Sequence, residues 1–234
     1  MFNGKKVLAL IPARGGSKRL PRKNLLSLDG KPLVNWSIDL ALANQFIDCV
    51  ILSTDDPEIV SVVDERVFIP ELRPDYLSTD LSTTLSVLLY TIEKFGQGFD
   101  ILMVLQPTSP IRKQEHINEA LSVFCTNSAF SVVSVTQCEH PPIWSNTLPE
   151  NGMMDGFIKS EGLKRSQDLD IFYRLNGSIY IYDIHELLKV KHVNFTENTY
   201  AYKMDNMYSI DIDNKIDFEM VEFFVQKYQL GIDY

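Results

Sequence analysis

The sequence predicts an α/β protein whose mostly parallel sheet is covered by helices on both faces. From residue 7 to residue 135, continuous apolar runs, typical of strands buried on both faces, alternate with segments of helical periodicity. This alternation favours an open sheet wound in right-handed strand–helix–strand units. With 234 residues and 45% hydrophobic side chains, the chain fits one large domain over residues 1–234.

The predicted strands and helices follow one another along the chain. Apolar runs predict strands at residues 7–11, 49–52, 101–105 and 130–135. Between these strands, apolar side chains recur on one helical face in three segments: Leu33, Trp36, Leu40 and Ala43, then Leu85, Leu88, Leu89, Ile92 and Phe95, and then Ile117, Ala120, Leu121 and Phe124. We expect the functional loops to follow the carboxyl ends of the first three strands, at residues 14–24, 53–56 and 106–112.

The pattern breaks between residues 137 and 172. This stretch contains prolines, glycines and scattered charges with little periodicity, and it is too long for an ordinary connection. We therefore expect an inserted excursion at 137–172 that either covers the functional site or pairs with a second subunit. Order returns with a strand at 177–182, a further strand that ends at 209–213, and a terminal helix with Ile216, Met220, Phe223 and Phe224 on one face.

A basic loop with two glycines follows the first predicted strand. Residues 14–31 contain six basic side chains and one acid, although the whole chain has 22 basic and 31 acidic side chains. A strand that ends in the pair Gly15-Gly16 can present backbone N–H groups to an anion, and nearby cations strengthen the attraction. The loop therefore predicts a site for the phosphates of a nucleotide; a solvated basic loop is the simpler alternative.

Several other classes of protein are disfavoured. The loop lacks the Gly-x-x-x-x-Gly-Lys-Ser/Thr motif of P-loop proteins and the Gly-x-Gly-x-x-Gly motif of dinucleotide-binding folds, and no Gly-x-Ser-x-Gly motif supports a serine hydrolase. The net charge of −9 disfavours a nucleic-acid partner. We expect neither a membrane span nor a secretory signal, and three widely spaced cysteines favour the reducing cytoplasm.

Two carboxylates alternate with isoleucines in the segment Ser209-Ile210-Asp211-Ile212-Asp213. On a strand, Asp211 and Asp213 would point to the same side. Neighbouring carboxylates repel each other unless a cation lies between them, and Mg²⁺ accepts one or two carboxylates together with phosphate oxygens. We therefore predict that Asp211 and Asp213 bind Mg²⁺. The alternative is that Asp213 caps the terminal helix and that Asp211 is solvated.

Three further segments are candidates for ligand binding. Gln106 ends a buried strand, and the prolines after it stiffen the turn, so its side chain could be held against a ligand. Residues 77–84 carry more hydroxyl and acidic side chains than a helix cap requires, which suggests the wall of a polar pocket. Arg165, Arg174 and Asn176 could meet an anionic second substrate, because a guanidinium fork matches a carboxylate.

Four ordered motifs resemble those of the acylneuraminate cytidylyltransferases, the CMP-sialic acid synthetases. The motifs are Ile11-Pro12-Ala13-Arg14-Gly15-Gly16-Ser17-Lys18 with Lys23-Asn24, Leu105-Gln106-Pro107-Thr108-Ser109-Pro110, Asn176-Gly177-Ser178-Ile179-Tyr180, and Ser209-Ile210-Asp211-Ile212-Asp213. The resemblance covers nearly the whole chain. It implies a three-layer Rossmann-like nucleotidyltransferase fold, a Mg²⁺ requirement, and a homodimer in which residues 137–172 reach the partner subunit.

The resemblance also implies roles for individual residues, some of them catalytic: Arg14, Lys23 and Asp211. The expected nucleotide-binding residues are Arg14, Gly15, Ser17, Lys23, Asn24, Arg73, Ser82, Thr84 and Gln106. The sugar acid would meet Gln106, Arg165 and Tyr180, to which we add Arg174 because of its place in the sequence. The same resemblance makes Asp211 and Asp213 the Mg²⁺ ligands.

The expected reaction transfers CMP from CTP to the anomeric hydroxyl of a nine-carbon 2-keto sugar acid, such as N-acetylneuraminic acid, and releases pyrophosphate. Some sialic-acid-specific relatives carry a lysine where this chain has Ile143-Trp144, so legionaminic and pseudaminic acids are alternative substrates. The shorter 3-deoxy-manno-octulosonic acid is a further alternative, which the pair Gly15-Gly16 disfavours. A nucleotide-binding module without catalysis would not need two carboxylates at Asp211 and Asp213.

Overall fold

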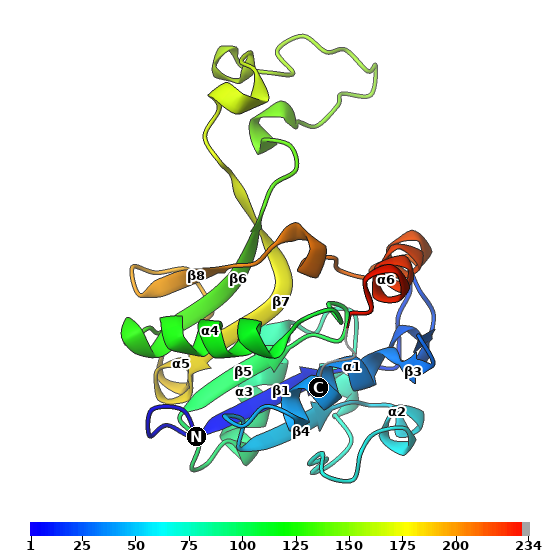
Figure 1. Cartoon of the computed structure of the whole chain (residues 1–234), viewed down its shortest axis with the longest axis vertical. Coiled ribbons are helices and arrows are strands. Elements are labelled where there is room, and N and C mark those ends of the chain that lie inside the picture. The colour runs from blue at the N-terminus through cyan, green and yellow to red at the C-terminus, as the bar shows by residue number, and fades with distance from the viewer. Residues whose placement is uncertain (231–234) are drawn as a thin grey trace.

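The computed structural model describes residues 1–230, without the side chains of Glu161 and Ser166. Within these residues, a central sheet has the strand order β4-β1-β5-β7-β6-β8 (Figure 1). The bounds of these strands are β1 Val7–Pro12, β4 Cys49–Ser53, β5 Ile101–Leu105, β6 Ser131–Gln137, β7 Tyr173–Asp183 and β8 Thr199–Lys203. Strand β7 runs antiparallel to both β5 and β6, while the other pairs are parallel, so the predicted mostly parallel sheet is confirmed.

Helices connect the strands, and their ends follow local sequence signals. The α-helices are α1 Leu33–Leu42, α2 Pro57–Ser61, α3 Thr84–Phe95, α4 Gln114–Thr126, α5 Ile184–Val190 and α6 Lys215–Tyr228. Thr83 caps α3 by accepting a hydrogen bond from the Ser86 N–H, and Asn214 caps α6 in the same way. A two-stranded hairpin, β2 Ser27–Leu28 and β3 Lys31–Pro32, precedes α1. The described part of the chain has no helix of the length and apolar character that a bilayer crossing requires.

Both faces of the sheet are buried, which confirms the expected three layers. Residues Val7, Ala9 and Ile11 of β1 pack into one apolar core with side chains of α1 and α4. The alternate residues Leu8 and Leu10 pack into a second core with side chains of α3 and α5. Because successive side chains of a strand point to opposite faces, burial of both sets requires an unbroken apolar run in the sequence.

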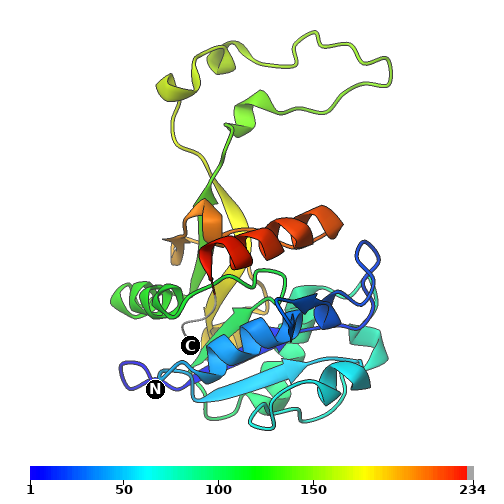
Figure 2. The same cartoon turned by 45° about the vertical axis from the view of Figure 1, so that its right-hand side comes forward.

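The segment between β6 and β7 leaves the sheet and extends away from the rest of the chain (Figures 1 and 2). It contains short 3₁₀ turns, at Pro142–Trp144, Ser160–Gly162 and Ser166–Asp168, and the Trp144 indole N–H closes it with a 2.7 Å hydrogen bond to the Gly162 carbonyl. Several large apolar side chains on this segment are exposed: Leu148, Met153, Met154, Leu163 and Ile171. Residues 138–172 thus connect β6 to β7 outside the sheet, and the dimerisation or site-covering role expected for the segment 137–172 stays a prediction.

One expectation about the C-terminal region is wrong, and the terminal helix is present as expected. Residues 209–213 form a loop and not a strand, because the Ile212 N–H donates to the Thr108 carbonyl at 2.8 Å and not to a neighbouring strand. Ile212 is fully buried in a core that it shares with α1 and α6. Helix α6 docks on this core through Val221 and Val225, whereas much of the predicted face, including Ile216 and Phe223, is exposed. The last four residues of the predicted domain, 231–234, lie outside the described part.

Candidate active site

A cavity of about 600 Å³ opens at the carboxyl ends of β1 and β5. Its wall consists of the loop after β1, the polar segment before α3, the first residues of α3, the turn after β5 and one residue before α6. The structure brings many of the predicted site residues together in this wall: Arg14, Ser17, Lys23, Asn24, Arg73, Ser82, Thr84, Gln106 and Asp213. These side chains therefore lie together at the edge of the sheet where they were expected, and their functional roles stay predictions.

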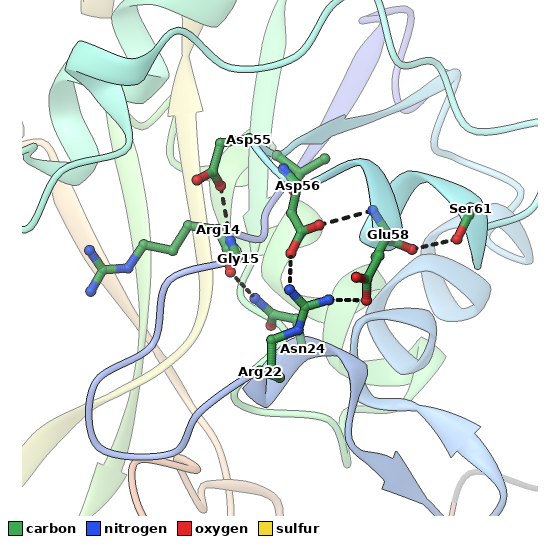
Figure 3. Close-up of polar contacts among 9 residues, drawn as sticks. Arg14, Gly15, Arg22, Asn24, Asp55, Asp56, Glu58 and Ser61 are labelled. Atoms are coloured by element: carbon green, nitrogen blue, oxygen red, sulfur yellow. Dashed lines mark hydrogen bonds and ion pairs between the residues drawn. The ribbon is translucent and has the colours of Figure 1, made fainter.

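The basic loop is fixed at both of its ends (Figure 3). The Gly15 N–H donates to Asp55 at 2.9 Å, and the Asn24 side-chain amide donates to the Arg14 carbonyl at 2.9 Å. Arg22 pairs with Asp56, at 3.0 Å, and with Glu58. Figure 3 shows the Arg14 side chain extending away from these contacts, so the backbone is anchored while the guanidinium is presented to the cavity.

The two loop glycines have different surroundings, and this difference gives a stability test. A Cβ atom at Gly15 would lie 2.5 Å from Asp56 Oδ2 and 2.8 Å from Asp56 Cβ, whereas a Cβ atom at Gly16 meets nothing within 4 Å. We expect Gly15→Ala to lower the melting temperature on the order of 5 °C, because the Asp56 segment must shift. Gly16→Ala is the matched control and should melt within about 1 °C of the wild type. Equal melting temperatures for the two variants in differential scanning calorimetry would contradict this packing.

Lys23 connects the basic loop to the carboxylate segment. Its Nζ donates to the Ile212 carbonyl at 2.5 Å and lies 3.6 Å from Asp213 Oδ1. Burial lowers the pKa of Lys23, while the charges of Asp213 and Asp211 act in the opposite direction. A partly desolvated ammonium attracts a phosphate more strongly than a solvated one, because less water screens its charge.

Arg73 supplies a second partly desolvated cation. The residue is only 8% exposed, and its guanidinium donates to the Ser53 hydroxyl, at 2.9 Å, and to the Ser53 carbonyl at the end of β4. Burial lowers the pKa of Arg73 to about 10, and the nearby Arg14 charge also lowers it. Arg73 therefore remains protonated at neutral pH and contributes positive charge to the cavity wall.

The predicted carboxylate pair lies beside these cations. Asp213 lines the cavity and pairs with Arg19 at 3.0 Å, while Asp211 lies next to the cavity without lining it. Asp211 is open to solvent, but the surrounding protein removes part of its hydration and so raises the pKa of its carboxyl group, an effect that the Asp213 charge reinforces. Asn214 caps α6, so the alternative in which Asp213 is the cap is wrong.

The donor set near Asp213 fits Mg²⁺. Asp211 and Asp213 provide carboxylate oxygens, the hard ligands that Mg²⁺ prefers, and only Ile212 separates them in the chain. Over residues 1–230, no group of three or more histidine, cysteine, aspartate and glutamate side chains could hold a metal ion. A site with two carboxylates suits Mg²⁺, which commonly takes its remaining ligands from substrate phosphates and water.

A second cavity of about 140 Å³ adjoins the first one. Gln106 and Thr84 line both cavities, and Tyr180, Tyr182 and Val193 line the smaller one. Burial raises the pKa of Tyr180, and the Asp211 charge raises it further. The structure therefore places Gln106 at the boundary between a large polar cavity and a small, more apolar one.

Some predicted residues lie elsewhere. Arg165 pairs with Asp168 at 2.8 Å on the extended segment, and Arg174 pairs with Glu139 at 3.3 Å. Neither arginine lines the large cavity or the smaller one beside it. Gly15 supports the basic loop through its N–H without lining the cavity.

Sequence reasoning gave no individual role to Asp80. Its carboxylate pairs with Arg14 at 3.1 Å and with Lys18 at 2.5 Å, and all three residues line the large cavity. The available signal was the excess of polar side chains at 77–84, which indicated a pocket wall but did not indicate which residue would face the cations.

Comparisons with known proteins agree with this architecture. A sequence model described as cytidylyltransferase matches residues 8–234. The chain is 37% identical to a CMP-N,N'-diacetyllegionaminic acid synthase of Legionella pneumophila, over 93% of this chain and 95% of that protein. A solved structure of CMP:2-keto-3-deoxy-manno-octonic acid synthetase complexed with CTP has the same fold, with a TM-score of 0.73 at 18% identity over 95% of this chain and 99% of the other.

A further relative is longer than this chain. An N-acylneuraminate cytidylyltransferase of Streptococcus agalactiae is 35% identical over 91% of this chain and 52% of its own length, so the chain spans about half of that relative. The match to the family model nevertheless covers nearly all of the chain, including the basic loop, the turn after β5 and the carboxylate segment. The chain belongs to the cytidylyltransferase family, and the acylneuraminate cytidylyltransferases are among its relatives.

Proposed function

We propose that this protein transfers CMP from CTP to the anomeric hydroxyl of a nine-carbon 2-keto sugar acid and releases pyrophosphate. The observation that carries the proposal is the large cavity in which cations of a glycine-containing loop lie opposite a polar wall and beside two carboxylates. A nucleoside triphosphate needs this combination of positive charge and oxygen ligands for a metal ion. The names of the relatives, which describe transfer to sugar acids of this class, support the choice of acceptor.

Each part of the cavity has a proposed role. Arg14, Lys23 and Arg73 bind the triphosphate, because their charges line the wall. The remaining polar residues of the wall seat the nucleotide: Ser17, Asn24, Ser82 and Thr84. Gln106 lies between CTP and the sugar acid, and Tyr180 contacts the sugar acid in the smaller cavity.

Asp211 and Asp213 would hold Mg²⁺. When bound, this ion would neutralise phosphate charge and make the α-phosphorus more electrophilic. The main difficulty of the reaction is that CTP and the sugar acid are both anions and repel each other, and cationic residues of the chain would reduce this repulsion. Lys23 and Arg73 keep positive charge in partly desolvated positions, where it stabilises the leaving pyrophosphate most strongly.

The extended segment is proposed to pair with a second copy of the chain. Its exposed apolar side chains would become buried in such a dimer, and Arg165 would then approach the sugar-acid site of the other copy. Arg174 remains a candidate for the same anionic substrate. Light scattering of the purified protein tests the dimer directly: a monomer at micromolar concentration would contradict it.

N,N'-diacetyllegionaminic acid is a second candidate for the acceptor. The legionaminic acid relative matches the chain over almost the full length of both proteins, whereas the N-acylneuraminate relative from Streptococcus agalactiae extends well beyond the match.

The cytoplasm is the proposed location, because Cys49, Cys125 and Cys138 are free thiols, which suits a reducing compartment.

Pyrophosphate release from CTP tests the proposed function. The assay contains Mg²⁺ and, in separate reactions, N-acetylneuraminic, N,N'-diacetyllegionaminic, pseudaminic and 3-deoxy-manno-octulosonic acids. Release with one of the nine-carbon acids supports the proposal and identifies the acceptor. Tight CTP binding without release in any reaction would contradict it and would favour a nucleotide-binding module.

Asp80 gives a further prediction because it competes for the cations that would bind CTP. Its carboxylate pairs with Arg14 and Lys18 in the ligand-free structure, and the triphosphate must replace these pairs. We expect Asp80→Asn to lower the dissociation constant for CTP by about threefold. The control is Asp29→Asn, the same change at an exposed turn with φ 51°, a conformation that asparagine adopts readily. Calorimetric titration checks both variants, and weaker CTP binding by Asp80→Asn would contradict the prediction.

A further inference from the structure

Arg112 is a fully buried arginine with no role in the site described so far. It lies between the turn after β5 and the start of α4, and it is 1% exposed. A guanidinium is costly to remove from water unless its N–H groups find hydrogen-bond acceptors. The groups that accept hydrogen bonds from Arg112 therefore indicate which part of the fold its burial serves to hold in place.

Arg112 contacts three parts of the fold at once. Its Nη1 donates to the Gln106 carbonyl at 2.9 Å and to the Ser178 carbonyl at 2.9 Å. Its Nη2 donates to the Ser37 hydroxyl. Ser37 belongs to α1 and Ser178 to β7, so Arg112 ties the turn after β5 to two rigid elements of the core.

The Gln106 carbonyl is held by several donors. Besides Arg112, the Ser37 hydroxyl and the Ser109 N–H donate to it, each at 3.3 Å. The side chain of Gln106 lines both cavities, at the boundary between the proposed CTP and sugar-acid sites. Arg112 is thus one of three groups that hold the backbone from which this side chain projects.

We propose that Arg112 is a positioning residue that holds Gln106 at the junction of the two substrates. The inference rests on the proposed function, because it assigns Gln106 the contact between CTP and the acceptor. The planar guanidinium reaches acceptors on different elements in one fixed geometry, whereas a lysine ammonium is a single point of charge on a flexible stem. Arg112→Lys therefore keeps the positive charge but loses the orientation of Gln106.

A double-mutant cycle with Arg112→Lys and Gln106→Ala tests the proposal. We expect Arg112→Lys alone to lower kcat/KM for the sugar acid by at least about tenfold, while the dissociation constant for CTP changes by less than about twofold. In the Gln106→Ala background, Arg112→Lys should lower kcat/KM for the sugar acid by less than about twofold, because the side chain that Arg112 positions is gone. Additive effects would overturn the proposal, since a merely structural role would not depend on the Gln106 side chain.

Two additions keep the test decisive. Arg66→Lys is the matched control, because Arg66 is exposed and pairs with Asp64 at the surface, and we expect no change in kinetics. If Arg112→Lys does not fold, Ser37→Ala removes one donor to the Gln106 carbonyl and enters the same cycle. A crystal structure of the folded variant gives a readout that does not depend on turnover, and an unmoved Gln106 side chain in it would overturn the inference. If the wild-type protein were inactive in the kinetic assay, that result would instead contradict the proposed function.

Discussion

Replacing Asp211 with asparagine is expected to lower turnover by about 100-fold or more, which corresponds to ~2.7 kcal/mol of transition-state stabilisation. Asparagine keeps the size of the side chain but removes the negative charge that would hold Mg²⁺ beside Asp213. Because partial loss of hydration and the Asp213 charge both disfavour the ionised form of Asp211, removal of the Asp211 charge should not destabilise the fold. Pyrophosphate release at saturating CTP and Mg²⁺, together with the melting temperature, measures both expectations.

The control for Asp211→Asn is the same substitution at Asp29. Asp29 is exposed in the turn between β2 and β3, away from the residues that line the large cavity, so turnover should remain within about twofold of the wild type. A folded Asp211→Asn protein with near-normal activity would remove the metal-binding role from Asp211. An equal loss in both variants would point to a general effect on the fold.

Replacing Lys23 with methionine should reduce kcat/KM for CTP by about 100-fold. Methionine fills a similar volume but loses the ammonium, which donates to the Ile212 carbonyl and lies beside Asp213. The variant thus loses a cation for the triphosphate and a link between the basic loop and the carboxylate segment. Steady-state kinetics with CTP as the varied substrate, and a calorimetric dissociation constant for CTP, measure the effect.

Lys215→Met provides the comparison for Lys23→Met. Lys215 is exposed at the start of α6 and pairs with Glu219, so its replacement should change CTP kinetics by less than about twofold. If folded Lys23→Met bound and used CTP as well as Lys215→Met does, the phosphate-binding role of the loop would be wrong. If only the melting temperature fell, Lys23 would be a structural link alone.

The parts of the fold that the sequence predicted well are those in which one local pattern has one physical cause. Strands β1 and β5 are buried on both faces, so the side chains of residues 7–11 and 101–105 lie in apolar cores and the sequence there is an uninterrupted apolar run. The basic loop was recognisable because a glycine pair and a cluster of cations stand out in an acidic chain.

Other features depend on contacts between distant segments, which a local pattern does not report. The alternation at 209–213 resembles a strand, but Ile212 is buried against α1 and α6, and its N–H pairs with Thr108 and not with a strand. Arg112 and Asp80 became relevant only when the fold placed them beside Gln106 and Arg14. Arg165 was predicted as a site residue from its place in an irregular stretch, but the structure places it between β6 and β7, on the segment that extends away from the sheet.

The most direct test of the central claim is ³¹P nuclear magnetic resonance of the complete reaction. The purified protein is incubated with CTP, Mg²⁺ and each of the nine-carbon acids, with reactions lacking the acid or the metal ion as controls. We predict that the CTP resonances decline while pyrophosphate and one phosphodiester resonance, that of a CMP-sugar, increase together only in a complete reaction. Unchanged CTP with all acids, or formation of CMP as a monoester without a phosphodiester, would contradict the proposed transfer.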